Sequence, residues 1–335
     1  MLRNLRTDGA CRLFFYANIQ RIALFALNFY TFYVILPIPH LEGKEKSMFG
    51  WLIVNSFIES EKFHSLYGFL QNAAKKHGVR LEMKTGAELL CDIQSDFDGV
   101  PLPDFVLFWD KDIYLAKRLE AKGLRLFNSA AAVEICDNKI LTSLCLKGKV
   151  PLPKTVIAPK TFEGVNYCKK DFLEKAVDIL GLPVIIKEAY GSFGKQVYLA
   201  STYEEAKAIV DSLGSKEFLL QEYVQSSHGR DVRVNVVGDK VVSAMLRYNE
   251  NDFRSNISSG GAMRPITLTK AQEETAINAC RAIGLDFAGV DILFGEEGEP
   301  IVCEVNSNPH FESSFTCTGV DMSELILEHI QGSLL

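Results

Sequence analysis

Apolar and amphipathic stretches alternate along the chain from residue 48 onward. Gly50–Val54 and Asp104–Trp109 are short runs of mostly apolar residues, which predict strands buried on both faces. Between them, Ser60–His77 carries apolar residues at helical spacing, and Gly78 ends that pattern. Strands at Val79–Met83 and Leu124–Phe127 and helices at Ala87–Cys91 and Asp112–Lys122 complete the series. Strands that alternate with helices predict a parallel, doubly wound α/β sheet in residues 48–130.

The pattern changes after residue 130. A helix is predicted over Ser129–Leu144, with Ser129 as its N-cap and Lys139 inside it. Pro151 and Pro153 then break the chain. Further strands are predicted at Thr155–Ala158, Pro183–Lys187, Gln196–Ala200, Phe218–Gln221, Asp231–Val237 and Lys240–Arg247, and helices at Asp171–Leu180, Thr269–Ile283 and Ser323–Ile330. Short loops between successive strands favour antiparallel hairpins in this part of the chain.

Two strands near the C-terminus, Val290–Phe294 and Pro300–Val305, are joined by a turn rich in Gly and Glu. Side chains alternate faces along a strand, so Glu304 and Asn306 project from the same side. Pairing of the two strands brings Asp291 within reach of that side. Two carboxylates and one amide oxygen suit a hard cation such as Mg²⁺. An exposed acidic hairpin without a ligand is the alternative interpretation.

A glycine-rich loop lies between the strand that ends at Lys187 and the strand that begins at Gln196. Its sequence, EAYGSFGK, contains Gly191 and Gly194, and glycines let backbone N–H groups approach phosphates closely. The Walker pattern G-x-x-x-x-G-K-[ST] is absent, and a plain glycine hairpin is the alternative. Glu222 follows the next strand, where its carboxylate and the neighbouring main chain suit an adenine edge and ribose hydroxyls.

The position of Arg247 depends on a strand register. The two strands that contain Asp231 and Arg247 are joined around Gly238-Asp239. With a three-residue turn, Gly238–Lys240, Arg247 lies opposite Asp231, and with a two-residue turn it faces away. Asp231 and Arg233 share one face in either case. Arginine here suits phosphoryl or carboxylate oxygens, and a surface ion pair is the alternative.

Polar residues suited to a substrate occur in several loops. Asn55 and Ser56 follow the first strand, and Asp110 and Lys111 follow another, at the edge where such sheets bind ligands. Solvated loop positions are the alternative for all of them. The polar, glycine-ended loop Asn251–Gly261 suits an anionic substrate. Its candidate residues are Arg254, Ser255 and Asn256.

Residues 1–47 differ from the rest of the chain. Ile22–Pro39, IALFALNFYTFYVILPIP, is an uncharged, aromatic-rich run preceded by arginines. It is about long enough for a marginal membrane helix with a cytoplasmic start, although its prolines and β-branched residues make a poor helix. Three interpretations stay open: an extension upstream of a natural start at Met48, a membrane anchor, and an added soluble element. The abrupt onset of globular patterning at Phe49 favours the first.

Composition narrows the classes of function. The 335 residues are 47% hydrophobic and 23% charged, with a formal net charge of −6, which is typical of a soluble globular protein of about two domains. The basic residues are dispersed, which argues against a nucleic-acid partner but not against a local phosphate site. The 8 cysteines include no C-x-x-C pair, so a reducing, cytoplasmic location is expected.

Several segments in a fixed order resemble the ATP-grasp superfamily, and most of all its RimK-type carboxylate–amine ligases. They are PVIIKEAYGSFGKQV, QEYV, RDVRVNVVGDKVVSAMLR, DFRSNISSGG, LDFAGVDIL and CEVNSNP. The resemblance implies an α/β (α+β) ATP-grasp fold, in which two α+β subdomains clasp ATP after a Rossmann-like pre-ATP-grasp domain. The implied boundaries are 48–130 for that first domain, 131–222 for the nucleotide-binding subdomain and 223–335 for the metal and catalytic subdomain. Residues 1–47 lie outside the resemblance.

The resemblance also implies roles for individual residues. Asp291, Glu304 and Asn306 match the Mg²⁺ ligands of the family, with Mn²⁺ as a substitute ion, and Arg247 matches the arginine beside the transferred phosphoryl group. The positions expected to bind ATP are Lys139, Lys187, Gly191, Ser192, Gly194, Gln221, Glu222, Tyr223, Val224, Asp231 and Arg233. The positions expected on the substrate side are Asn55, Arg254, Ser255 and Asn256, and Lys187, Arg247 and Arg254 are expected to act in catalysis.

Two short segments depart from the usual pattern of the group. In the glycine loop, Phe193 stands where a smaller polar residue is frequent, and Lys195 stands where an aliphatic one is frequent. His310 follows Pro309 where glycine is usual. These departures concern closure of the loop and the shape of the acceptor pocket.

The implied activity is an ATP-dependent ligase that joins a carboxylate to an amine through an acyl phosphate and releases ADP and phosphate. The substrates are expected to be amino acids or peptides, with a protein or a cofactor as a further class of acceptor, and a homo-oligomer is expected. Two alternatives come from other classes. One is a kinase that phosphorylates a hydroxyl, and the other is a nucleotide-binding module tethered to a membrane through residues 22–39.

Overall fold

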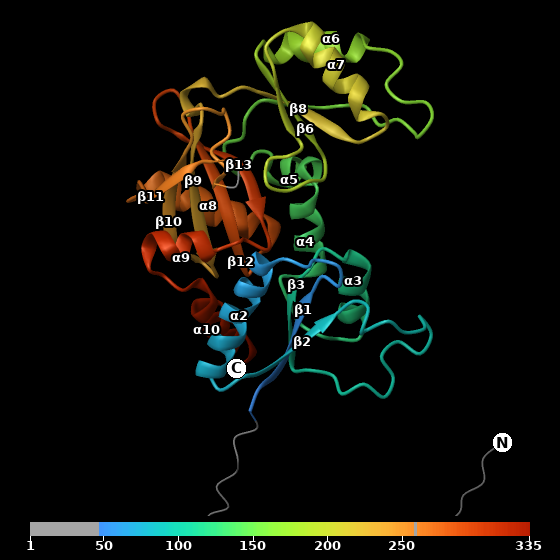
Figure 1. Cartoon of the computed structure of the whole chain (residues 1–335), viewed down its shortest axis with the longest axis vertical. Helices are drawn as coiled ribbons and strands as arrows, with labels where there is room; N and C mark the ends of the chain where they lie inside the picture. The colour runs from blue at the N-terminus through green and yellow to red at the C-terminus, as the bar shows by residue number, and fades with distance from the viewer. Residues whose placement is uncertain (1–46, 258–259) are drawn as a thin grey trace, which may run out of the picture. The chain divides into compact units, whose positions relative to one another are not determined.

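The structure is a computed structural model that describes residues 47–257 and 260–335 (Figure 1). Ser47–Leu335 forms a unit of its own. The candidate anchor at residues 22–39 lies outside the described residues. Within the described residues, no helix combines the length and the apolar character that crossing a bilayer requires.

A parallel sheet comes first along the described chain. It contains β1 (Phe49–Val54), β2 (Arg80–Thr85), β3 (Phe105–Trp109) and β4 (Leu126–Phe127), in the order β2-β1-β3-β4. α2 (Glu61–Lys76) packs on one face and α3 (Ile113–Ala121) on the other, because the central strands are apolar on both sides. The predicted parallel, doubly wound sheet is confirmed.

The helix predicted over Ala87–Cys91 is wrong. The chain makes a turn there, in which the amide N of Leu89 donates to the carbonyl O of Thr85 at 3.1 Å. The Glu88 carboxylate turns back and accepts from the amide N of Thr85 at 2.7 Å. So short a stretch gains too few intrahelical hydrogen bonds to offset the cost of nucleating a helix.

The single helix predicted over Ser129–Leu144 is two helices, α4 (Ala130–Asp137) and α5 (Lys139–Leu146). Asn138 separates them, with φ −109° and ψ 110°, and its side chain accepts from two backbone N–H groups of α5 at 2.9 and 3.2 Å. Asn favours such caps because its side chain competes for backbone groups in a helix interior. Lys139 is therefore the first residue of α5, and Ser129 caps α4 as predicted.

The second sheet is antiparallel and 4-stranded, in the order β5-β8-β6-β7. Its elements are β5 (Thr155–Ile157), α6 (Asp171–Leu180), β6 (Val184–Glu188), β7 (Val197–Ala200), α7 (Tyr203–Leu213) and β8 (Phe218–Glu222). α6 and α7 cover one face, and the other face is left for the site. α7 was not predicted, although Thr202 caps it and Ala206, Val210 and Leu213 form its buried stripe.

The third sheet is 5-stranded, in the order β11-β10-β9-β12-β13. Its strands are β9 (Arg230–Val237), β10 (Lys240–Tyr248), β11 (Ala262–Pro265), β12 (Phe287–Phe294) and β13 (Pro300–Asn306), and α8 (Lys270–Ile283), α9 (Glu312–Thr318) and α10 (Met322–Leu334) accompany them. α8 begins with a capping box of Thr269 and Gln272 and ends at Gly284, as predicted. β11 and α9 were not predicted. α10 packs into the same core as α2, so this sheet and the parallel sheet share an apolar cluster.

The register of β9 and β10 places Arg247 opposite Asp231. The turn at Gly238-Asp239 has two residues, which by itself would turn Arg247 away. A β-bulge at Val242 shifts the register by one residue and restores the pairing. Neither register considered from the sequence combined the short turn with a bulge.

Candidate active site

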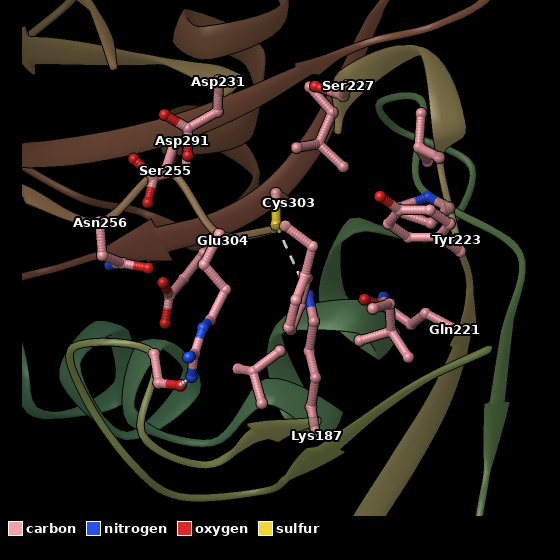
Figure 2. Close-up of a pocket in the computed structure, with 18 of the residues that line it drawn as sticks. Lys187, Gln221, Tyr223, Ser227, Asp231, Ser255, Asn256, Asp291, Cys303 and Glu304 are labelled. Atoms are coloured by element: carbon pink, nitrogen blue, oxygen red, sulfur yellow. Dashed lines mark hydrogen bonds between the residues drawn. The ribbon is translucent and has the colours of Figure 1, made fainter. Parts of the chain in front are cut away.

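A first pocket lies between the antiparallel four-stranded sheet, β5-β8-β6-β7, and the five-stranded sheet (Figure 2). β6 and β8 contribute to one wall, and β9, β10, β12 and β13 to the facing wall. The predicted site residues that line it are Lys139, Lys187, Gly191, Gly194, Gln221, Glu222, Tyr223, Val224, Asp231, Arg247, Arg254, Ser255, Asn256, Asp291 and Glu304. Most of the positions expected to bind ATP therefore meet in one place, although they come from distant parts of the chain.

Two lysines enter the first pocket from different elements. Lys187 of β6 is buried, and its Nζ lies 3.5 Å from the Sγ of Cys303 (Figure 2). Lys139 begins α5, where its Nζ donates to the Gly191 carbonyl O at 2.9 Å and lies 3.7 Å from the Glu304 carboxylate. Burial lowers the pKa of Lys139, while Glu304 opposes that shift and Lys187 adds to it. Two ammonium groups beside one glycine loop suit the phosphates of a nucleotide.

The glycine loop between β6 and β7 is closely packed. A Cβ atom at Gly191 would lie 2.4 Å from Gln196 Oε1, and one at Gly194 would lie 2.7 Å from Asn256 Oδ1. Both glycines have positive φ, 138° and 72°, so a side chain would be strained as well as crowded. Arg254 Nη1 donates to the Gly194 carbonyl O at 2.8 Å and ties the loop to the facing wall. A side chain at either position would therefore be strained and would displace Gln196 or Asn256, so glycine favours the packing of the loop against the pocket.

The chain after β8 forms another part of the first pocket. Tyr223 and Val224 line it, and the Gln221 side chain donates to Thr155 Oγ1 at 3.0 Å. One oxygen of the Glu222 carboxylate accepts from the amide N of Lys154 at 2.8 Å. A strand end with an aromatic ring, an apolar side chain and nearby backbone groups suits a planar heteroaromatic ring.

Asp231, Arg247, Asp291 and Arg233 form a chain of ion pairs at the centre of the site. Arg247 Nε donates to Asp231 Oδ1 at 2.8 Å, and its Nη2 lies 2.9 Å from Asp291 Oδ2. Arg233 Nη2 donates to the same Asp291 oxygen at 2.9 Å. Burial lowers the pKa of Arg247, but the carboxylates of Asp231 and Asp291 outweigh burial and raise it. Burial likewise opposes ionisation of Asp291, yet the two guanidinium groups hold its pKa below the ordinary value.

The three predicted metal ligands lie on adjoining strands. Asp291 pairs with Glu304, and Gly289 pairs with Asn306, whose Nδ2 donates to the Gly289 carbonyl O at 3.4 Å. This bond leaves Asn306 Oδ1 to join the two carboxylates in an all-oxygen set, which suits Mg²⁺. In residues 47–257 and 260–335, no group of three or more His, Cys, Asp or Glu is arranged to hold a metal ion. The metal assignment stays a prediction, in which phosphate oxygens or water complete the shell.

A bulge in β13 brings Cys303 into the first pocket beside Glu304. Simple alternation would put these neighbours on opposite faces. The register of β12 and β13 shifts by one residue between Asp291 and Ile292, so Cys303 is the extra residue on its strand. Burial raises the pKa of the Cys303 thiol. Gln196, which also lines the pocket, was missed as well, and its only sequence signal is that it follows the glycine loop.

A second pocket adjoins the first. Asn55 and Asp110 line it from the parallel sheet, and Asn55 Nδ2 donates to Asp110 Oδ1 at 3.0 Å. Other lining residues are Lys62, Phe63, Tyr67, Trp109, Lys111, Asp137, Ser192, Phe193, Arg233, Asn306, Asn308 and His310. Arg247, Asn256 and Glu304 line both pockets. A group in one pocket can therefore meet a group in the other beside Arg247 and Glu304.

The two pockets divide the predicted ATP-binding and substrate residues differently from the two predicted groups, and the roles of these residues stay predictions. Ser192 and Arg233 were expected to bind ATP, but they line the second pocket, where Lys111 Nζ donates to the Ser192 hydroxyl at 3.3 Å. Arg254 and Ser255 were expected on the substrate side, but they line the first pocket. The hydrogen bond from Arg254 to the Gly194 carbonyl O holds their loop against the glycine loop.

The two departures from the family pattern meet at Lys62 of α2. Its Nζ lies 4.9 Å from the centre of the Phe193 ring, in a cation–π contact. His310 Nε2 donates to the Lys62 carbonyl O at 3.2 Å. Burial lowers the pKa of His310, so its imidazole is neutral at neutral pH. Phe193 and His310 therefore shape the second pocket, where the acceptor was expected.

Comparison with known proteins identifies the family. A family model for the RimK-like ATP-grasp domain matches residues 136–330. The chain belongs to the RimK-like ATP-grasp family. A probable alpha-L-glutamate ligase of Trichodesmium erythraeum is 36% identical to this RimK-like chain over 224 residues, which are 66% of the chain and 72% of that protein. Beta-citrylglutamate synthase B of Danio rerio is 34% identical over 227 residues, 66% of the chain and 54% of that protein.

Solved structures share the fold of this RimK-like chain. The RimK-domain ATP-grasp protein of Sphaerobacter thermophilus superimposes with a TM-score of 0.65 at 19% identity, covering 84% of the chain and 99% of that protein. The predicted ATP-grasp fold is confirmed. Because of the family to which it belongs and the relatives it matches, the chain is an ATP-dependent carboxylate–amine ligase. These findings set aside the alternatives of a hydroxyl kinase and of a module without catalysis.

Proposed function

We propose that this RimK-like ligase holds ATP in the first pocket and its carboxylate and amine substrates in the second, and that they react where the pockets join. The observation that carries the proposal is that Arg247 and Glu304 line both pockets. Lys139 and Lys187 would contact the phosphates, and Tyr223 and Val224 the adenine. The terminal phosphate and the substrate carboxylate would then meet beside Arg247, whose planar fork suits both anions.

The proposed reaction has two steps. An oxygen of the substrate carboxylate attacks the terminal phosphorus of ATP, the bond from that phosphorus to the bridging oxygen breaks, and an acyl phosphate and ADP form. The neutral amine, R–NH₂, then attacks the acyl carbon and forms the C–N bond, inorganic phosphate leaves with the electron pair of the broken C–O bond, and the nitrogen gives up one proton to that phosphate or to water. Neither step needs a protein nucleophile. Arg247 and Lys187 stabilise the charge on the transferred group, and the walls of the pockets align the reactants.

Asp291, Glu304 and Asn306 are proposed to hold Mg²⁺, or Mn²⁺ in its place. Two carboxylates and one amide oxygen on adjoining strands are hard ligands that leave coordination positions for phosphate oxygens. The ion, when bound, neutralises phosphate charge and helps align the terminal phosphate. The chain itself supplies the spacing of the three oxygens through the β12–β13 pairing.

An acidic α-amino acid is proposed as one substrate. The relative from Trichodesmium erythraeum bears the name of a probable alpha-L-glutamate ligase. The second pocket offers this chain both charges that such a substrate needs, with Lys62 and Arg233 for carboxylates and Asp110 for an ammonium group. Mass spectrometry of the product would identify the amine acceptor and distinguish a small molecule from a protein.

The test is the release of ADP and phosphate from Mg-ATP in the presence of pooled amino acids. Glu304→Gln keeps the shape of a partly exposed side chain and removes one proposed metal ligand, so turnover should fall by at least about a hundredfold. The matched control is Glu296→Gln, an identical change in the exposed turn of the same hairpin, and it should keep wild-type turnover. Equal turnover of the two folded variants would contradict the proposed metal site.

A further inference from the structure

Asn128 follows β4 of the parallel sheet, and all hydrogen bonds of its side-chain amide go to main-chain groups at the five-stranded sheet. Its Nδ2 donates to the carbonyl O of Phe287 at 2.9 Å and to that of Ser307 at 2.8 Å. Its Oδ1 accepts from the amide N of Asp286 at 2.7 Å and from that of Phe287 at 3.3 Å. The residue is 0% exposed. A carboxamide has two N–H donors and two acceptor lone pairs, so the capacity of this side chain is fully used.

The main-chain groups that Asn128 binds lie at the open end of the β12–β13 hairpin. Phe287 is the first residue of β12, upstream of Asp291, and Ser307 directly follows Asn306, the last residue of β13. The last pairing between these strands is that of Gly289 with Asn306, and beyond it the chains separate. Asn128 supplies hydrogen bonds to both chains where the ladder ends, so it holds the two ends at a fixed separation.

The same junction fastens the second pocket to this hairpin. Trp109 of β3 stacks on Phe287 with ring centroids 5.2 Å apart and an interplanar angle of 14°. Asn308 Nδ2 donates to the carbonyl O of Asp110 at 3.0 Å. Asn128 follows β4 and so belongs to the parallel-sheet domain at this junction. The same sheet also supplies Asn55 to the second pocket. A shift of the hairpin against the parallel sheet would therefore move the predicted metal ligands relative to the substrate side.

We infer that Asn128 is a positioning residue for the ligase reaction: its amide fixes the open end of the β12–β13 hairpin and so sets the separation of Asp291 and Asn306 and their distance from the second pocket. The inference rests on the proposed function, because it takes Asp291 and Asn306 as metal ligands. Asn128 itself lines neither pocket, and it acts through the backbone of the two strands.

Asn128→Asp tests the inference in the full-length protein. The change keeps the shape of the side chain but replaces the NH₂ group with an oxygen that faces two carbonyl oxygens, so both donated bonds are lost and repulsion takes their place. We expect the affinity of the ATP-loaded protein for Mn²⁺, followed by electron paramagnetic resonance, to fall about tenfold or more, as when the supports of metal ligands are removed. The kcat should fall similarly, while the KM for ATP stays within about twofold because the proposed phosphate-binding lysines lie on other elements.

Two further variants separate an effect of Asn128 on the metal site from general disturbance of the junction and from failure of the metal assignment. Arg125→Gln removes the 2.9 Å ion pair between the half-exposed Arg125 and the largely buried Asp286 at the same junction, and it should leave Mn²⁺ affinity and kcat unchanged. Glu304→Gln reports on the proposed metal site itself. If Glu304→Gln binds Mn²⁺ as the wild type does, the proposed function fails, and the inference fails with it.

If Glu304→Gln loses Mn²⁺ while Asn128→Asp keeps wild-type affinity and kcat, only the inference about Asn128 is overturned. A lower unfolding temperature of Asn128→Asp with unchanged Mn²⁺ affinity per folded molecule would also overturn it, because the role would then be purely structural. Should Asn128→Asp fail to fold, Asn128→Ser takes its place. Serine is uncharged and smaller, keeps one donor and loses the bridge, so the same fall in Mn²⁺ affinity is expected.

Discussion

Lys139 is a largely buried cation whose charge depends on pH more than that of an exposed lysine. Burial lowers its pKa below the ordinary value of 10.5, Glu304 opposes the shift, and Lys187 and Lys111 add to it. As pH rises, Lys139 therefore loses its proton before exposed lysines do, and the proposed phosphate site loses one positive charge. We expect kcat/KM for ATP to fall with rising pH, as measured by ADP release, because this quantity reports groups of the free enzyme.

Lys139→Arg separates this effect from the other groups that titrate at high pH. Arginine stays charged throughout the range, so the alkaline fall should move to higher pH in this variant. Lys147→Arg, an identical change at the exposed C-terminal end of α5, should leave the profile where it is. Superimposable profiles for wild type and Lys139→Arg would show that Lys139 does not control binding of ATP.

At the scale of elements, the break at Asn138 decides where Lys139 points. The break lets the amide N of Lys139 donate to the Ala189 carbonyl O at 2.9 Å, which sets the start of α5 against the glycine loop. Asn138→Ala removes the cap, at a cost of about 1 kcal/mol in the free energy of unfolding, and favours a continuous helix. We expect the KM for ATP to rise about tenfold with little change in kcat, which is the pattern of lost binding.

Ser129→Ala is the matched control for that variant. Ser129 caps α4 through the bond from the Ala132 amide N to Ser129 Oγ at 3.3 Å, so its loss costs a similar free energy of unfolding. It does not lie at the start of α5, and the KM for ATP should stay at the wild-type value. An equal rise of KM in both variants, measured at matched folded fraction, would mean that stability alone is responsible.

The elements that could be predicted from the sequence are those with a strong local signal. The buried strand β3 is a continuous apolar run, and α8 has a capping box at one end and Gly284 at the other. The sequence reading missed α7 despite its cap and buried stripe, and it also missed β11 and α9. Other failures lie where one residue interrupts a period. Asn138 ends one helix and starts another, and the bulges at Val242 and Cys303 each shift a register. Periodicity does not indicate such interruptions, because tertiary contacts decide which residue leaves the ladder.

At the scale of the whole described unit, most residues predicted to bind ATP line the first pocket, and the others line the second. The resemblance brought Lys187, Asp291 and Glu304 to one site, and all of them line the first pocket. The second pocket depends on how the parallel sheet meets the β12–β13 hairpin. Asn128 binds main-chain groups that are distant in the sequence, such as that of Asp286, 158 residues further on. No local sequence pattern indicates such a contact. The division between the pockets therefore required the structure.

Binding of the metal ion should depend on the nucleotide, because the pairing of Asp291 spans both pockets. Asp291 Oδ2 lies 2.9 Å from the Nη2 atoms of both Arg233 and Arg247, so a free cation would meet two guanidinium charges. Phosphates of ATP would draw Arg247 toward themselves, because Arg247 lines the pocket proposed for ATP. We therefore expect Mn²⁺ to bind the protein about tenfold or more tightly in the presence of ATP than in its absence, and ATP affinity to rise by the same factor with Mn²⁺. Arg233→Gln should strengthen Mn²⁺ binding without ATP, and equal Mn²⁺ affinity with and without ATP in the wild type would contradict this coupling.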